Sequence, residues 1–161
     1  MLTEIAGIPS HPLLVHAAVV LLPLAALALV VAAWWPAARA RLGVGLPVLA
    51  LVAALACYLA KESGEKLEQR PSMEGMREQI AGHETQGTAT FLWSLALLVV
   101  AVLVWAGSSP AVASRASGAT VLSGRAGSVV LGVLSTLAAA ACIWGVIAAG
   151  HSGATMVWSG L

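Results

Sequence analysis

Four histidines are the residues of this chain best suited to chemistry, because an imidazole can bind a metal ion or transfer a proton near neutral pH. They are His11, His16, His83 and His151. The first two open the first long apolar segment, His83 precedes the third, and His151 follows the fourth. If the apolar segments cross a membrane in alternating directions, all four histidines lie at the same membrane face.

The composition identifies the elements that must position these histidines. Of the 161 residues, 60% are hydrophobic and 9% are charged, whereas a soluble domain has about 45–50% apolar and about 25% charged residues. The net charge of +1 provides no attraction to a polyanion. These figures exclude a water-soluble enzyme and a nucleic-acid-binding protein, and they predict an integral membrane protein with the lipid bilayer as its surroundings.

Four segments are long enough to cross a bilayer core of about 30 Å, which takes about 20 helical residues. Apart from Lys61 at the end of the second segment, they contain no charged residue. The predicted spans are residues 12–35, 42–61, 88–106 and 128–150. We therefore expect an all-α fold, a single domain over residues 1–161 that forms an antiparallel four-helix membrane bundle.

The basic residues predict the orientation of this bundle. The connections after the first and third spans carry only basic residues, among them Arg39 and Arg41 in a short turn. Cytoplasmic connections are enriched in Lys and Arg, so both termini and the histidines are expected outside. The outer connection contains strong helix formers around a break at Pro71, with Ser72 able to cap a second helix. It predicts a helical hairpin that projects outward between the second and third spans.

Two further features concern the interior of the bundle. His83, Gly87, Thr90 and Ser94 share one face of a helix, and a small, polar face of a membrane helix normally points into the bundle. The two cysteines, Cys57 and Cys142, lie in spans at different depths. A disulfide requires closely matched positions, so both are expected to be reduced packing residues.

The motifs around the histidines resemble a bacterial family of small four-helix membrane proteins of unknown function. The most specific motif is HPxxVH at residues 11–16, although Ala17-Ala18 stand where members typically have Phe-Pro. Further matches are the segment 64–68, His83-Glu84 and the segment 150–153, so that the resemblance covers nearly the whole chain. It implies a multi-pass protein of a bacterial inner (plasma) membrane and supplies no activity.

Three hypotheses for function remain open. Paired imidazoles from facing helices are the usual ligands of a b-type haem, with His16 and His83 as axial ligands and His11 and His151 as second-choice ligands or partners of the propionates. Such a protein would transfer electrons between a quinone pool and a periplasmic redox partner.

The second hypothesis places copper or zinc at the same four histidines, because imidazole and thioether ligands suit copper and Met73 and Met76 also fall on the outer side. The third is a non-catalytic structural or interaction subunit, and the small-residue faces leave a homodimer open. The sequence has no nucleophile elbow, P-loop or HExxH motif, so we expect a binding protein or electron carrier rather than an enzyme.

Overall fold

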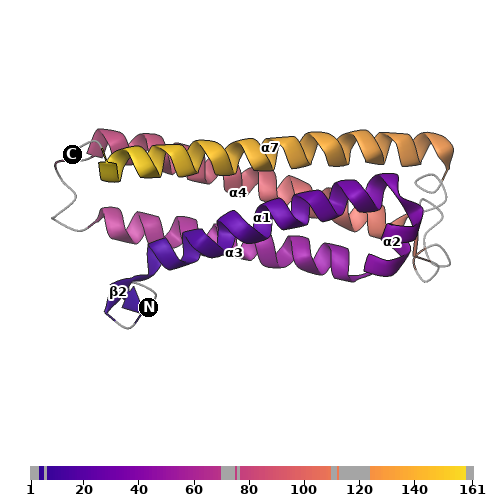
Figure 1. Cartoon of the computed structure of the whole chain (residues 1–161), viewed down its shortest axis with the longest axis horizontal. Coiled ribbons are helices and arrows are strands. Elements are labelled where there is room, and N and C mark those ends of the chain that lie inside the picture. Colours follow the sequence, from indigo (N-terminus) through magenta and orange to yellow (C-terminus); the bar gives the residue numbers. More distant parts are fainter. Residues whose placement is uncertain are drawn as a thin grey trace.

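Four long helices lie side by side in the computed structural model, which describes residues 4–5, 7–69, 75, 77–109, 112 and 124–158 (Figure 1). A short helix, α2, connects the first two long helices, and a minimal antiparallel β-hairpin precedes them. In chain order the elements are β1 (Glu4–Ile5), β2 (Ile8–Pro9), α1 (Ser10–Trp34), α2 (Pro36–Leu42), α3 (Gly45–Glu68), α4 (Arg77–Ala106) and α7 (Arg125–Trp158). Each of the four long helices is long and apolar enough to cross a membrane, which confirms the four expected apolar helices.

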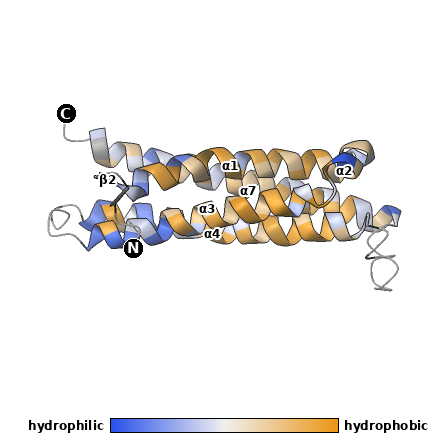
Figure 2. Ribbon diagram, turned by 90° about the horizontal axis from the view of Figure 1, so that it is seen from below, coloured by the Kyte–Doolittle hydropathy of each residue, from blue (hydrophilic) through white to orange (hydrophobic). Residues whose placement is uncertain are grey.

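The surface of the helices shows which solvent the fold requires. Hydrophobic residues cover the middle of all four long helices, and hydrophilic residues gather toward the two ends (Figure 2). Large apolar side chains such as Leu24, Leu27 and Leu137 are more than half exposed. Helices that are apolar on all sides are typical of membrane spans, because lipid is a suitable surrounding for such side chains and water is not.

The interior of the bundle consists largely of small residues. Each long helix contacts two neighbours along its length, α1 and α4 each packing against both α3 and α7, whereas α1 and α4 contact one another little. The interface therefore depends on close backbone approach, which small residues allow. Buried alanines on α1 and α3 include Ala25, Ala26, Ala32, Ala50 and Ala53.

The connection between α1 and α3 follows from local sequence. Trp35 has an extended backbone, as expected for a residue before proline, and Pro36 opens α2 as its first residue. The Arg39 guanidinium donates to the carbonyl oxygens of Ala32 and Ala33 at 2.8 and 2.5 Å. These bonds satisfy carbonyls at the end of α1 and keep the arginine at this end of the bundle.

The last helix is longer than the sequence predicted. We expected the fourth span to end at residue 150, whereas α7 continues to Trp158 and so contains His151. Gly150 and Gly153 do not stop it, because a glycine inside a helix costs only about 1 kcal/mol and no proline follows. The cysteines are as expected, since Cys57 and Cys142 are both free and buried.

A glycine contact between α4 and α7 provides a test of this packing. A Cβ on Gly145 would lie 2.7 Å from Thr90 Oγ1 and 3.4 Å from the Thr90 backbone, whereas a Cβ on Gly150 would meet no atom within 4 Å. We expect Gly145→Ala to lower the free energy of unfolding by about 1–3 kcal/mol, the usual effect of overpacking. Gly150→Ala, on the same helix, should leave it unchanged or raise it slightly. Unfolding in detergent measures both, and equal stability of the two variants would contradict this packing.

Candidate histidine site

Two of the four histidines meet at one end of the bundle. The ring centres of His11 on α1 and His83 on α4 are 6.2 Å apart, and the ring planes are nearly perpendicular at 87°. Because α1 and α4 otherwise contact one another little, these rings join the two halves of the bundle across its interior. Both side chains are half-buried.

His11 is held by the end of α3. Its Nδ1 lies 2.9 Å from the carbonyl oxygen of Ala60 and 3.2 Å from Ser63 Oγ. The Ser63 hydroxyl itself donates to the Ala60 carbonyl at 2.8 Å. A carbonyl oxygen can only accept, so the proton of the neutral His11 ring is on Nδ1.

His83 is held by α7 in the same way. Its Nδ1 lies 2.9 Å from Ser152 Oγ, and the Ser152 hydroxyl donates to the Ala149 carbonyl at 3.0 Å. A hydroxyl has one proton, and when this proton is donated to Ala149, Ser152 Oγ accepts from His83 Nδ1–H, the tautomer that His11 also has.

The consequence of both arrangements is an unprotonated Nε2 on each neutral ring. In a neutral imidazole one nitrogen is the donor and the other carries the lone pair. A metal-binding histidine has this arrangement, in which the N–H that faces away from the metal donates to a carbonyl or another acceptor and thereby fixes the tautomer. His11 and His83 are therefore prepared to act as ligands through Nε2.

Two glycines allow the rings to pack this closely on α3 and α7. A Cβ on Gly64 would lie 3.0 Å from His11 Cε1, and a Cβ on Gly153 would lie 3.2 Å from His83 Cε1. Either methyl group would push its ring away from the helix that holds it. Both glycines lie within the motifs of the resemblance, but their position in the sequence does not connect them with the histidines.

Next to the pair, α4 offers a polar atom and space. The Gln86 side-chain oxygen is buried and, within the described residues, has no hydrogen-bond partner. Leaving a buried acceptor unsatisfied costs about 1–3 kcal/mol, so this oxygen is suited to a donor from outside the chain. A Cβ on Gly87, one turn after His83, would meet no atom within 4 Å.

The other two histidines are not part of this pair. His16 is exposed, and its Nδ1 lies 2.6 Å from the Pro12 carbonyl of its own helix. A separation of five residues turns a helical side chain well away from its predecessor, which explains why His11 faces the interior and His16 does not. His151 is exposed on α7. The expected pairing was His16 with His83, whereas the structure brings His11 and His83 together.

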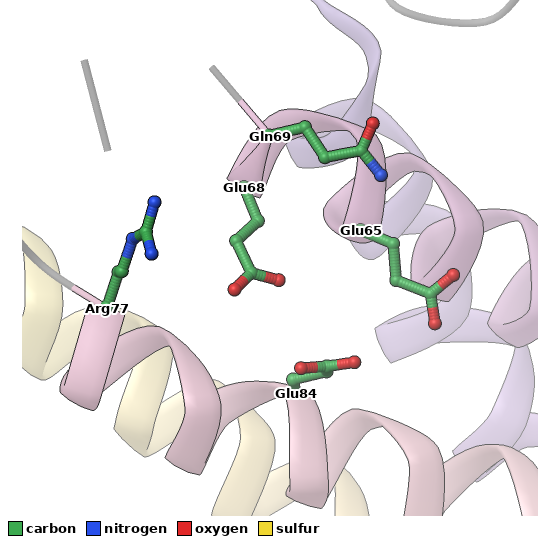
Figure 3. A pocket seen from close by; sticks show the side chains of 5 residues that line it. All are labelled: Glu65, Glu68, Gln69, Arg77 and Glu84. Atoms are coloured by element: carbon green, nitrogen blue, oxygen red, sulfur yellow. The ribbon is translucent and has the colours of Figure 1, made fainter. Parts of the chain in front are cut away.

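The same end of the bundle carries an acidic cavity of about 440 Å³. Figure 3 shows Glu65 and Glu68 from α3 facing Glu84 from α4, with Arg77 beside them. Two of the acidic residues at the end of α3 pair with lysines of the same helix, Lys61 with Glu65 and Lys66 with Glu62. The surface beside the histidines is therefore polar and rich in carboxylates.

A cluster of three or more metal-binding side chains does not occur in the described ranges when histidine, cysteine and acidic residues are considered. Met73 and Met76, which the sequence placed near a copper site, lie outside the described residues. Comparison with protein families, with curated proteins and with solved structures finds no match to this chain. The resemblance based on HPxxVH therefore stays a prediction, and the histidines themselves are the features that indicate a function.

The hydrogen bonds of the two rings predict different effects for two substitutions. An asparagine amide can place an N–H where Nδ1–H lies and has no second ring nitrogen. We expect His11→Ala and His83→Ala each to lower the free energy of unfolding by about 0.5–1.5 kcal/mol, the typical value of one hydrogen bond. His11→Asn and His83→Asn should recover most of this loss. Unfolding in detergent tests this prediction, and Asn variants as unstable as the Ala variants would show that Nδ1–H does not hold the helices.

Proposed function

We propose that His11 and His83 bind one metal centre through their Nε2 atoms, that this centre is the iron of a b-type haem, and that the protein carries electrons. The observation that carries the proposal is the pair of imidazoles fixed through Nδ1, each with Nε2 left for a ligand. Cofactor sites in helical bundles are built in this way, from side chains on facing helices.

The spacing of the rings supports a shared metal centre. Metal–nitrogen bonds of about 2.0–2.1 Å place two imidazoles on one ion with ring centres about 5–6.5 Å apart. The observed separation is 6.2 Å. The two rings thus have a separation suited to ligands of a single ion.

The number of ligands favours haem over zinc. Zinc is bound by three or four protein side chains, and the described residues contain no such cluster. A porphyrin supplies four nitrogens to its iron, so two imidazoles complete the coordination. A Cβ on Gly87 would meet no atom within 4 Å, so a bound group can approach α4 closely one turn after His83.

Within this proposal, the residues of the chain bind and orient the group. When bound, the iron would supply reversible one-electron chemistry, with a potential that depends on its axial ligands, on their hydrogen bonds and on burial. Ser63 and Ser152 hold the ligand rings, and the apolar spans keep water away from the side of the site that faces the bilayer.

We further propose the arrangement in the membrane. The four spans would cross a bacterial plasma membrane in alternating directions, with both termini and a hairpin between α3 and α4 outside. Basic residues favour the cytoplasmic side, and Arg39 and Arg41 lie on α2, at the end of the bundle opposite the start of α1 (Figure 1). The histidine pair would then exchange electrons with a periplasmic partner or a quinone.

Copper is a second candidate for the same two nitrogens, because imidazole is also a good copper ligand and a pair of fixed rings 6.2 Å apart suits a single ion. Zinc at this position would need further ligands from outside the described residues. Metal analysis of the purified protein distinguishes these ions from haem iron.

An absorption spectrum tests the proposal. Protein purified in detergent from cells supplied with a haem precursor is expected to show a Soret band, with α and β bands that sharpen on reduction by dithionite. His11→Asn and His83→Asn, which keep the Nδ1-type hydrogen bond, should lose at least nine-tenths of the bound haem, because each removes one of the two ligands.

The matched controls are His16→Asn and His151→Asn, which change exposed histidines outside the pair. Both should keep the wild-type spectrum. A featureless visible spectrum of the wild-type protein would overturn the haem proposal, and stoichiometric copper in the same sample would replace it by the copper site.

A further inference from the structure

The two histidines of the pair are held by the same short motif. His11 lies on Ala60-x-x-Ser63-Gly64, and His83 lies on Ala149-x-x-Ser152-Gly153. In each motif the serine hydroxyl donates to the alanine carbonyl, the histidine Nδ1 lies against the serine, and the glycine faces the ring. The histidines are 72 residues apart in the chain, and the motifs are 89 residues apart.

The burial pattern of α1 repeats in α4 at the same spacing. The buried residues Leu22, Ala25, Leu29 and Ala32 of α1 correspond, 72 residues later, to Ser94, Leu97, Ala101 and Val104 of α4. All eight side chains are buried. The two helices therefore present the same face to the interior when they are aligned on their histidines.

The pattern of α3 repeats in α7 as well. Aligned on the serines, Leu46, Ala50 and Ala53 correspond, 89 residues later, to Ser135, Ala139 and Cys142, and all six are buried. The contacts follow the same scheme, because α1 packs along α3 as α4 packs along α7, and each pair also packs against the other.

From these matches we infer that the chain consists of two copies of one helix pair, α1 with α3 and α4 with α7, related by an approximate two-fold axis between His11 and His83. Each copy contributes an equivalent half-site, defined as one histidine with its Ala-x-x-Ser-Gly motif. Ser63 and Ser152 are then positioning residues, because each acts on the ligand through its histidine.

The inference restricts the ligand, and this part rests on the proposed function. Two equivalent half-sites would hold a centre that takes the same ligand from each helix pair, as an iron bound by two histidines does. A substrate with two chemically different ends would need different residues on the two helix pairs. The symmetry of the protein is confined to the residues around the two histidines. Other matching positions of the two helix pairs differ, for example Leu14 and Gln86.

Nitrogen NMR of the unloaded full-length protein tests the half-sites without any cofactor. With ¹⁵N-labelled histidine, His11 and His83 are each expected to show a protonated Nδ1 and an unprotonated Nε2. A valine at either glycine would displace the neighbouring ring from its acceptors. Gly64→Val should abolish this signature for His11 and leave His83 unchanged, and Gly153→Val should do the reverse.

Three further variants keep the test decisive if a valine prevents folding. Ser63→Ala and Ser152→Ala remove only a hydroxyl, and each should shift the Nδ1 resonance of its own histidine in the same direction. Gly150→Val, where a Cβ would meet no atom within 4 Å, is the control and should change neither histidine.

Responses of His11 and His83 in opposite directions, a response of only one of them, or Nε2-protonated rings in the unmodified protein, would overturn the inference. Its outcome is independent of the haem proposal. If the protein binds no haem while both pairs of variants respond alike, the equivalent half-sites stand and the proposed function fails. If haem is bound and only one histidine responds, the duplication fails and the electron carrier stands.

Discussion

The hydrogen bond from each histidine Nδ1–H to a neighbouring helix is the interaction on which the site depends. In an apolar bundle a polar ring is expensive unless it is paired, and a helix offers few free acceptors along its length, because its carbonyls are already used. Here the Ala60 carbonyl and the Ser63 hydroxyl perform this task for His11, and the Ser152 hydroxyl performs it for His83. Glycine at the next position lets the ring approach. The chemistry of Nε2 follows, since a neutral ring that donates through one nitrogen presents a lone pair on the other.

The membrane explains why so little else in the chain is polar. Lipid covers the large apolar side chains on the outside. Because lipid tails are as apolar as these side chains, the hydrophobic effect does not drive the helices together. What remains to hold the helices together is close packing, and alanines and glycines provide it along the interior. The middle of the helices is hydrophobic, and hydrophilic residues gather toward the ends of the bundle (Figure 2). The polar side chains suited to a site lie near one end of the bundle, where His11 and His83 meet.

The spans could be predicted from the sequence because a membrane span is recognised by its length and hydropathy, whichever face of the helix is buried. The identity of the paired histidines could not be predicted, because length and hydropathy do not show which face of a helix points into the bundle. Since α1 is apolar on all sides, hydropathy does not show whether His11 or His16 faces inward, and the depth of His16 in the membrane was a misleading guide. The helix rotation between them, fixed by α3 packing against α1, decides the matter. One sequence signal was available, namely the repeated Ala-x-x-Ser-Gly motif, whose meaning became visible only when each copy lay beside a histidine.

The central claim is that one metal centre is held by His11 and His83 through Nε2. X-ray absorption fine structure at the iron edge of the purified, haem-loaded protein tests it most directly, because imidazole rings give a characteristic multiple-scattering pattern. We expect two imidazole ligands per iron in the wild-type protein, two in His16→Asn, and one or none on the small amount of iron that His11→Asn retains. Two imidazoles that persist in His11→Asn, or iron without any imidazole in the wild-type protein, would contradict it.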